Sequence, residues 1–211
     1  MRGWRRIFWC FSVLGLALAF ASASHGQGTI RYVDANFSYG PIPGFDYRLL
    51  DLDGDGTADF VIDSTMGITT VLQANEENRM LAFPNWDGGA LLDPLLEGLP
   101  IGARPALPDQ FWAGRASISA CSTIGCLGPW LGVRAYAGVE FRIDGAIHYG
   151  WIHLENWDWV NVGNVLGWAY ETRPGVPILA GAVPEPSTWA LMIGGGVLMM
   201  WFRRKQHERR G

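Results

Sequence analysis

The chain has 211 residues, of which 49% are hydrophobic and 13% aromatic, with 16 Lys and Arg against 20 Asp and Glu. This apolar content can form a core, which excludes a disordered polymer, and the length suits one domain of ordinary size. The net charge of −4 excludes the basic folded surface that nucleic-acid binding requires, so we expect no nucleic-acid partner.

The charge is divided unevenly along the chain. Residues 24–183 contain 8 basic and 18 acidic residues, which gives a net charge of −10, whereas both ends of the chain are basic. Such a division indicates that the ends direct the chain to its destination and that the middle is the functional part. The sequence therefore predicts three segments: 1–23, 24–183 and 184–211.

Residues 1–23 have the order of parts of a secretory signal peptide. Three arginines precede an apolar run over residues 7–20, and the small residues 21–23 follow as a cleavage site. The run of 14 residues is shorter than the roughly 20 that span a bilayer. We therefore expect a signal helix that the export machinery recognises and a signal peptidase removes. The alternative is a retained membrane anchor.

Residues 24–183 have the pattern of an all-β domain. The segment lacks a convincing amphipathic helix of more than ten residues, and many short strands with turn signals favour an antiparallel β-sandwich or jelly roll. Residues 91–108 are rich in Pro and Leu and predict a long loop. Short β-branched or apolar runs between Gly, Pro, Asn and Asp predict strands at 29–33, 47–50, 60–62, 68–72, 116–120, 160–165 and 168–171.

Residues 51–59, which read Asp-Leu-Asp-Gly-Asp-Gly-Thr-Ala-Asp, form the best chemical motif. Carboxylates at alternate positions can turn inward around a hard cation, and Gly56 permits the sharp turn. An all-oxygen ligand set suits calcium better than zinc, and close carboxylates couple metal binding to local folding. The alternative is an acidic turn without a metal. The expected calcium ligands are the carboxylates of Asp51, Asp53, Asp55 and Asp59 and the backbone carbonyl of Thr57.

The spacing of this loop resembles the first nine positions of an EF-hand. Position 12 is Ile62 instead of the bidentate Glu, and the flanks predict strands instead of helices. The loop looks more like the calcium loops that join strands in integrin-type propeller repeats. This resemblance implies a structural calcium site, and the single copy argues against a full propeller. The departure from the EF-hand pattern leaves Asp63 as a further candidate ligand and argues against regulatory opening.

Cys121 and Cys126 are the two cysteines of the middle segment. In an oxidising compartment they are expected to form a local disulfide. Closing so short a loop stabilises the fold by roughly 2 kcal/mol at most. A zinc site needs further ligands, and the four intervening residues do not match a redox pair.

Residues 139–155 predict a β-hairpin. Residues 139–143 alternate in hydrophobicity, and the Asp-Gly pair at 144–145 suits a two-residue type I′ turn. His148 and His153 are five residues apart on the second strand, so they point to opposite faces and do not form one metal site. The two-residue turn predicts two opposed pairs, Phe141 with His148 and Ile143 with Ala146.

Two features of the middle segment suggest glycan chemistry. Alternation places Trp157 and Trp159 on one face beside Asn residues, and an exposed pair could stack on sugar rings as a lectin-like module that binds extracellular polysaccharide. A glycan hydrolase is the second alternative, since its chemistry needs two facing carboxylates and the segment contains several acids. The candidates for that pair are Glu140, Asp144, Glu155 and Asp158. Their simpler explanation is that they are ordinary acidic residues of the surface.

Residues 184–211 combine three features at the carboxyl end. The run Val183-Pro184-Glu185-Pro186 cannot continue a helix and stays extended. A 14-residue apolar stretch over 189–202 follows, and a basic cluster over 203–210 closes the chain. So short a transmembrane helix would cross only with snorkelling side chains and local thinning of the bilayer. The alternative is an ordinary single-pass anchor.

This order of motif, short apolar stretch and Arg-rich end closely resembles the PEP-CTERM sorting signal of Gram-negative bacteria. The resemblance covers about the last 28 residues. It implies that an exosortase cuts near the Pro-Glu-Pro motif while the chain is anchored in the inner membrane with its middle segment in the periplasm. The protein then passes to the cell surface or into extracellular polysaccharide. Residues 141–145, 148–154, 168–175 and 177–181 also look like a module of secreted bacterial proteins with this tail. That resemblance supports the fold and the location, and it transfers no activity to this chain.

The sequence as a whole therefore predicts an exported, non-enzymatic surface or matrix protein with a calcium-stabilised β domain. The export machinery, the signal peptidase and the exosortase are its expected transient partners. Extracellular polysaccharide is the candidate partner of the lectin-like alternative, and the sequence names no other ligand for the β domain.

Overall fold

The structure is a computed structural model that describes residues 30–41, 46–64, 69–122, 125–157 and 161–184. The described residues form strands and no helix, so the all-β prediction is confirmed. The predicted signal helix and transmembrane helix lie outside these ranges. The strands are β1 (Ile30–Tyr39), β2 (Tyr47–Leu50), β3 (Phe60–Asp63), β4 (Thr69–Ala74), β5 (Arg79–Pro84), β6 (Ala90–Leu92), β7 (Pro100–Ile101), β8 (Phe111–Ala113), β9 (Arg115–Ser122), β10 (Gly125–Leu127), β11 (Arg134–Ile143), β12 (Ala146–Asn156), β13 (Gly163–Glu171) and β14 (Ile178–Leu179).

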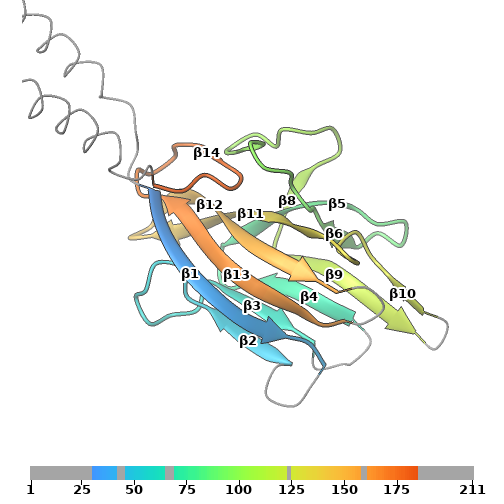
Figure 1. Cartoon of the computed structure of the whole chain (residues 1–211). Helices are drawn as coiled ribbons and strands as arrows, with labels where there is room; N and C mark the ends of the chain where they lie inside the picture. Colours follow the sequence, from blue (N-terminus) through green and yellow to red (C-terminus); the bar gives the residue numbers. More distant parts are fainter. Residues whose placement is uncertain (1–29, 42–45, 65–68, 123–124, 158–160, 185–211) are drawn as a thin grey trace, which may run out of the picture.

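Twelve of these strands form one sheet, shown in Figure 1. Its path runs β1-β13-β12-β11-β5-β6-β9-β4-β3-β2, with β10 beside β9 and β8 beside β5, while β14 and β7 form a separate pair. The sheet curls until its edge strands β1 and β2 are neighbours (Figure 1). There Arg48 donates from Nε to the carbonyl of Ser38 at 2.9 Å. The sheet is therefore nearly closed into a barrel-like shape.

The pairing of β6 with β9 distinguishes this sheet from the purely antiparallel arrangement expected from the sequence. Leu91 pairs with Ser117 in parallel, which makes the sheet mixed. Through this pairing, hydrogen bonds run without a break along the described strands from β1 to β2. The strands on the two sides of the domain, which we call its walls, therefore belong to one continuous sheet.

The predicted hairpin is confirmed with its register. Asp144 and Gly145 have φ values of 51° and 80°, and a type I′ turn requires positive φ at both central positions. Right-handed strand twist favours this turn because its backbone twist matches that of the strands it joins. The observed opposed pairs are the predicted ones, Phe141 with His148 and Ile143 with Ala146.

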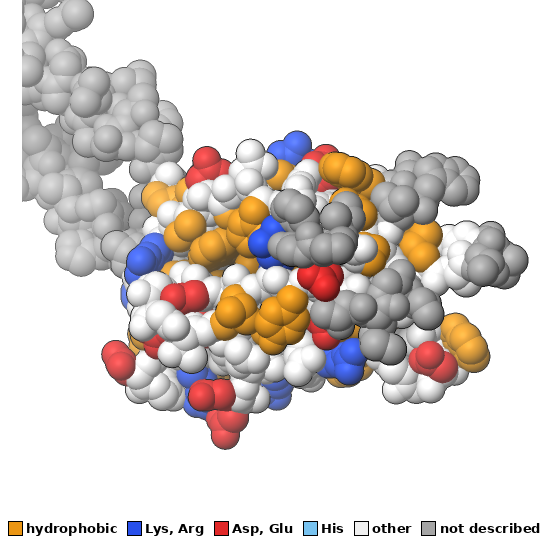
Figure 2. All heavy atoms as spheres, turned by 90° about the horizontal axis from the view of Figure 1, so that it is seen from below, with side chains coloured by type: hydrophobic (Ala, Val, Ile, Leu, Met, Phe, Trp, Pro, Cys, Tyr) orange, Lys and Arg blue, Asp and Glu red, His pale blue; other side chains and the backbone are white. Residues whose placement is uncertain are grey.

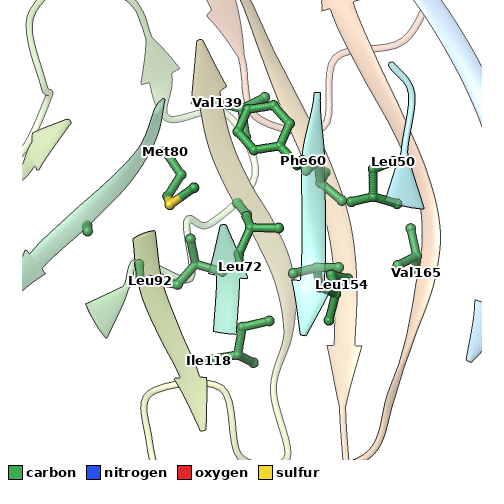
Figure 3. Packing of buried hydrophobic residues seen from close by; sticks show 14 of the residues in the cluster. Leu50, Phe60, Leu72, Met80, Leu92, Ile118, Val139, Leu154 and Val165 are labelled. Atoms are coloured by element: carbon green, nitrogen blue, oxygen red, sulfur yellow. The ribbon is translucent and has the colours of Figure 1, made fainter. Parts of the chain in front are cut away.

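Two apolar clusters hold the sheet together. The inner cluster fills the space enclosed by the curled sheet, where side chains from both walls meet (Figure 3). Burial of so many large apolar side chains is the main favourable contribution to folding. Its members include Leu50, Phe60, Leu72, Met80, Leu92, Ile118, Val139, Leu154 and Val165.

The outer cluster lies on the opposite face of β11, β12 and β13. Tyr149 and Trp151 of β12 belong to it, whereas Ile152 and Leu154 belong to the inner cluster, as the alternation of a strand requires. The segment that contains Leu95, together with β7 and β14, covers this face. Much of the expected long loop at 91–108 is thus irregular chain that packs on the sheet.

The underside of the molecule is shown in Figure 2. Hydrophobic side chains gather near the middle of this face, and acidic and basic side chains lie around them. This face of the domain is therefore mixed in chemistry, with exposed apolar groups between charges.

Candidate functional site

The acidic loop at residues 51–59 connects β2 to β3, as the sequence predicted. Its two ends are joined, because Asp59 donates its backbone N–H to the carbonyl of Leu50 at 2.8 Å and Leu52 donates to Asp59 Oδ2 at 2.8 Å. The Leu52 side chain is buried and anchors the loop in the domain. The loop therefore leaves and re-enters the sheet at one point.

Three of the four predicted carboxylates come together. Asp51, Asp53 and Asp59 each place one carboxylate oxygen within 4.8 Å of the others. Asp59 is 8% exposed and the other two are half-buried. Asp55 is exposed and lies outside this group, and its Oδ1 accepts the backbone N–H of Thr57 at 2.6 Å. We call Asp51, Asp53 and Asp59 the acidic triad.

Backbone N–H groups of the loop turn toward the triad. Asp51 accepts from Gly54 at 2.7 Å and from Gly56 at 2.9 Å through its two carboxylate oxygens. Asp53 accepts from Asp55 at 3.0 Å. Gly54 and Gly56 have φ values of 83° and 92°, a region in which a Cβ is strained, so the glycines are needed for this tight winding.

Side chains that are distant in the sequence hold the loop from outside. Arg31 of β1 donates to the carbonyl of Asp53 at 2.6 Å, and Trp168 of β13 donates from Nε1 to the carbonyl of Leu52 at 3.1 Å. Asn78 donates to Asp59 Oδ1 at 3.2 Å. Sequence reasoning missed these groups, since they lie 19 to 116 residues from their partners and no local pattern links them.

Burial and neighbouring charges oppose ionisation of Asp59 and Asp53. The pKa of Asp59 is raised to about 6: burial is the largest cause, the charges of Asp53 and Asp51 add to the rise, and hydrogen bonds from Leu52 and Asn78 offset part of it. Burial and the neighbouring carboxylates also raise the pKa of Asp53. The candidate metal ligands of the triad are all carboxylate oxygens, and their negative charges repel one another. A hard divalent cation fits this arrangement.

The other candidate ligand, Asp63, is not part of this group. It lies at the far end of β3, opposite Val71 of β4. The triad and Asp63 are thus separated by the length of a strand.

Cys121 and Cys126 are joined by a disulfide. They face each other across the β9–β10 pairing, so the bond staples the two strands next to their connection. This position suits a structural bond that restrains the end of a strand pair.

The predicted aromatic and sorting residues lie at the edges of the described ranges. Trp157 is 47% exposed, and Trp159 lies outside the described residues. Val183 and Pro184 are exposed at the end of the last described range, while Glu185 and Pro186 lie beyond it.

The three candidate hydrolase carboxylates that the structure describes do not face one another across the hairpin. Glu140 is buried, forms an ion pair with Arg79 and lies opposite Tyr149. Glu155 is at the far end of the hairpin, opposite Arg134. Asp144 is in the hairpin turn, and Asp158 lies outside the described residues.

No helix in the described ranges has the length and apolarity needed to cross a membrane. Comparisons with known proteins found no matching family model, no matching curated protein and no matching solved structure.

Proposed function

We propose that the chain is an exported bacterial protein that an exosortase sorts through its carboxyl-terminal tail. In this proposal the β domain is a structural or interaction module of the cell surface or extracellular matrix, without a catalytic role. The observation that carries it is the order of Pro-Glu-Pro motif, short apolar stretch and basic end in the last 28 residues. The basic, apolar and small-residue order at residues 1–23 supports export.

The end of the described chain supports processing at this motif. Trp151 donates from Nε1 to the carbonyl of Ala182 at 3.1 Å, and Ala182 donates its N–H to Leu179 at 3.0 Å. The next residue, Val183, is 47% exposed. The motif thus begins directly after Ala182, so cleavage near it leaves the hydrogen bonds of Ala182 and the domain contacts described above intact.

We further propose that calcium stabilises this domain. Asp51, Asp53 and Asp59 would hold the ion, which supplies the positive charge that their close carboxylates lack. Because Arg31 and Trp168 bind the same loop, an ordered loop would tie β2 and β3 to β1 and β13 across the seam of the sheet. The finer fold proposal is a β-sandwich or jelly-roll relative, in which the two walls of the curled sheet pack on the inner cluster.

The sorting proposal is tested by expressing the full chain in a Gram-negative bacterium with and without an exosortase. Mass spectrometry of the released protein is expected to find a carboxyl end near Pro186 only when the exosortase is present. A variant with Pro184→Ala and Glu185→Ala is expected to stay in the membrane fraction uncut. Release of a chain that still carries residues 189–211 would refute the proposal.

The calcium proposal is tested by titration calorimetry of the full chain in mild detergent, with CaCl₂ as the probe. Asp53→Ala with Asp59→Ala is expected to abolish the binding heat, because it removes two of three close carboxylates. Asp55→Ala is the matched control from the same loop, and it is expected to weaken binding far less. No heat with the unaltered chain, or equal loss in both variants, would contradict the triad as the site.

A further inference from the structure

The inner face of the curled sheet becomes polar at the end where β1 and β12 finish and β13 begins (Figure 1). Tyr39 lies opposite Gly163, and Gly163 lies opposite Asn156, so one row of residues crosses β1, β13 and β12. We call these three residues the end row. Asn156 follows Ile152 and Leu154 of the inner cluster at every second position, so its side chain points to the inside of the curled sheet. Tyr39 is 0% exposed and Asn156 is 1% exposed.

The polar atoms of the end row have no hydrogen-bond partner among the described residues. They are the Tyr39 hydroxyl oxygen Oη and both amide atoms of Asn156, Oδ1 and Nδ2. The backbone of Asn156 is paired, because its N–H donates to the carbonyl of Val133 at 3.0 Å. An unpaired buried amide or hydroxyl is costly, and such groups in folded proteins are nearly always paired with protein groups or ordered water.

Four other polar side chains are buried near this end and do find protein partners. They are Ser64, Thr70, Ser119 and Asn161. The hydroxyls of Ser64 and Thr70 are 2.8 Å apart, and Ser119 donates to Asn161 Oδ1 at 2.7 Å. Asn161 adjoins the end row, since a Cβ built on Gly40, the residue after Tyr39, would lie 3.0 Å from the Asn161 carbonyl oxygen. The unpaired groups of the end row therefore do not reflect a general lack of hydrogen bonding at this end.

The Tyr39 hydroxyl lies over Gly163 and close to the strand that carries Asn156. A Cβ built on Gly163 would lie 2.5 Å from Tyr39 Oη and 2.2 Å from the carbonyl oxygen of Glu155, the residue before Asn156. The two oxygens are therefore no farther apart than the sum of these distances, which one water with two hydrogen bonds of about 2.8 Å can span. Burial, and to a smaller extent the charge of Glu155, raises the pKa of Tyr39. The hydroxyl thus stays protonated and can donate as well as accept.

We propose that the end row binds ordered water, which bridges the Tyr39 hydroxyl to the side-chain amide of Asn156. Water both donates and accepts, so it can pair with the amide nitrogen, the amide oxygen and the hydroxyl together. A metal cation would leave the amide N–H groups unpaired, and the burial of both side chains suits a ligand of the size of water. The bound water would tie β1, at the seam of the sheet, to β12 across β13. The inference goes beyond the proposed sorting function and does not depend on calcium at the triad.

The test is nuclear magnetic resonance of the full chain, labelled with ¹⁵N in mild detergent, and it measures cross-relaxation between water and side-chain N–H groups. The Asn156 amide hydrogens are expected to show a cross-peak at the water frequency with the sign of bound water, which differs from that of hydrogen exchange. The indole N–H of Trp130 is the matched control, because it is buried in the inner cluster and donates to the Leu92 carbonyl at 2.9 Å. It is expected to show no such peak. Absence of the peak at Asn156, or an equal peak at Trp130, overturns the proposal.

A pair of substitutions tests the bridge by its effect on stability. Tyr39→Phe and Asn156→Leu each remove one side of the bridge, so each is expected to lower the melting temperature. The double variant is expected to lower it by less than the sum of the two shifts, because the same water is lost in each case. Replacing an unpaired buried polar group by an apolar one would instead stabilise the fold. Higher melting temperatures in both single variants, or shifts that simply add, therefore overturn the proposal.

Discussion

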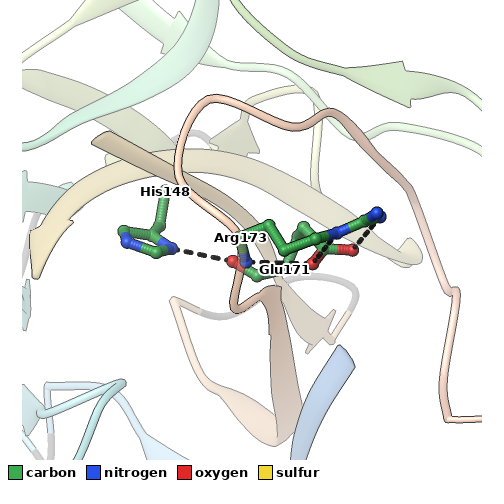
Figure 4. A network of polar contacts seen from close by, with 3 residues as sticks. All are labelled: His148, Glu171 and Arg173. Atoms are coloured by element: carbon green, nitrogen blue, oxygen red, sulfur yellow. Dashed lines mark hydrogen bonds and ion pairs between the residues drawn. The ribbon is translucent and has the colours of Figure 1, made fainter. Parts of the chain in front are cut away.

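Glu171 at the end of β13 shows how one buried carboxylate is kept ionised in this domain. It is 4% exposed, and it accepts the backbone N–H of Arg173 at 3.0 Å and the Arg173 side chain at 3.1 and 3.3 Å (Figure 4). His148 donates from Nδ1 to the backbone carbonyl of Glu171 at 2.9 Å. Burial alone would raise the pKa of Glu171, but the Arg173 hydrogen bonds and the charges of Arg173 and His148 outweigh it and lower the pKa.

The lowered pKa predicts a pH-dependent effect of Glu171→Gln. The unfolded carboxyl titrates at about pH 4.3, and the folded one titrates lower, so its stabilising contribution is present above that pH and is lost as the pH falls through the folded pKa. The variant is expected to lose about 1 kcal/mol of unfolding free energy at pH 7, since Arg173 is half exposed and screened. The loss should shrink near pH 3. Urea unfolding followed by circular dichroism measures both, and an equal loss at both pH values would contradict the assignment.

The acidic triad shows which parts of the candidate site could be predicted from the sequence. Its carboxylates were predictable because all of them come from one nine-residue loop with glycines at the turns. The exposed position of Asp55 was not predictable, since strict alternation places it with Asp53. The contacts of Arg31 and Trp168 depend on closure of the whole sheet, which no local pattern encodes.

At the scale of one element, the β11–β12 hairpin depends on its two turn residues. Gly145 has a φ of 80°, so Gly145→Ala places a Cβ in a strained region although its surroundings are open. We expect a loss of about 1 kcal/mol in urea unfolding. Gly114→Ala is the control, because Gly114 has no positive φ and no atom within 4 Å of a built Cβ. Equal effects of the two substitutions would show that the turn conformation is not the cause.

A comparison of this hairpin with β5 explains why some strands could be predicted from the sequence and others could not. The hairpin alternates between the two faces and carries a turn signal, so its register followed directly. β5 was missed, because Met80 and Ala82 belong to the inner cluster while Leu81 between them belongs to the outer cluster. A strand buried on both faces reads as a continuous apolar run and loses the period of two.

At the scale of the whole molecule, the order of strands along the sheet differs from their order in the chain. β5 lies between β11 and β6, and β6 pairs in parallel with β9. This order assembles a surface hollow of about 480 Å³ from β3, β4, β6, β9 and the turn before β6, with lining residues that span 63 to 117. Pairings of such long range are decided by the best burial of all strands together, so neither the nearly closed sheet nor the hollow has a local signature in the sequence.

The carboxyl-terminal strand β14 is expected to be part of the stable fold, in contrast to the tail that follows it. Ile178 is 4% exposed and Ala180 is 1% exposed in the outer cluster, and Ile178 pairs with Ile101 of β7. A chain that stops after Pro186 keeps these contacts, whereas one that stops after Val176 uncovers Trp151 and its neighbours.

We therefore expect the melting temperature of the Pro186 form to match that of the full chain. The Val176 form should lose about 3 kcal/mol, because burying one Ile side chain contributes roughly 1.5–3 kcal/mol and further contacts are lost with it. Thermal unfolding by circular dichroism measures the difference, and dye binding to exposed apolar surface checks its cause. Equal destabilisation in both forms would place the stabilising contacts in the tail and would contradict release of an intact domain by cleavage near the motif.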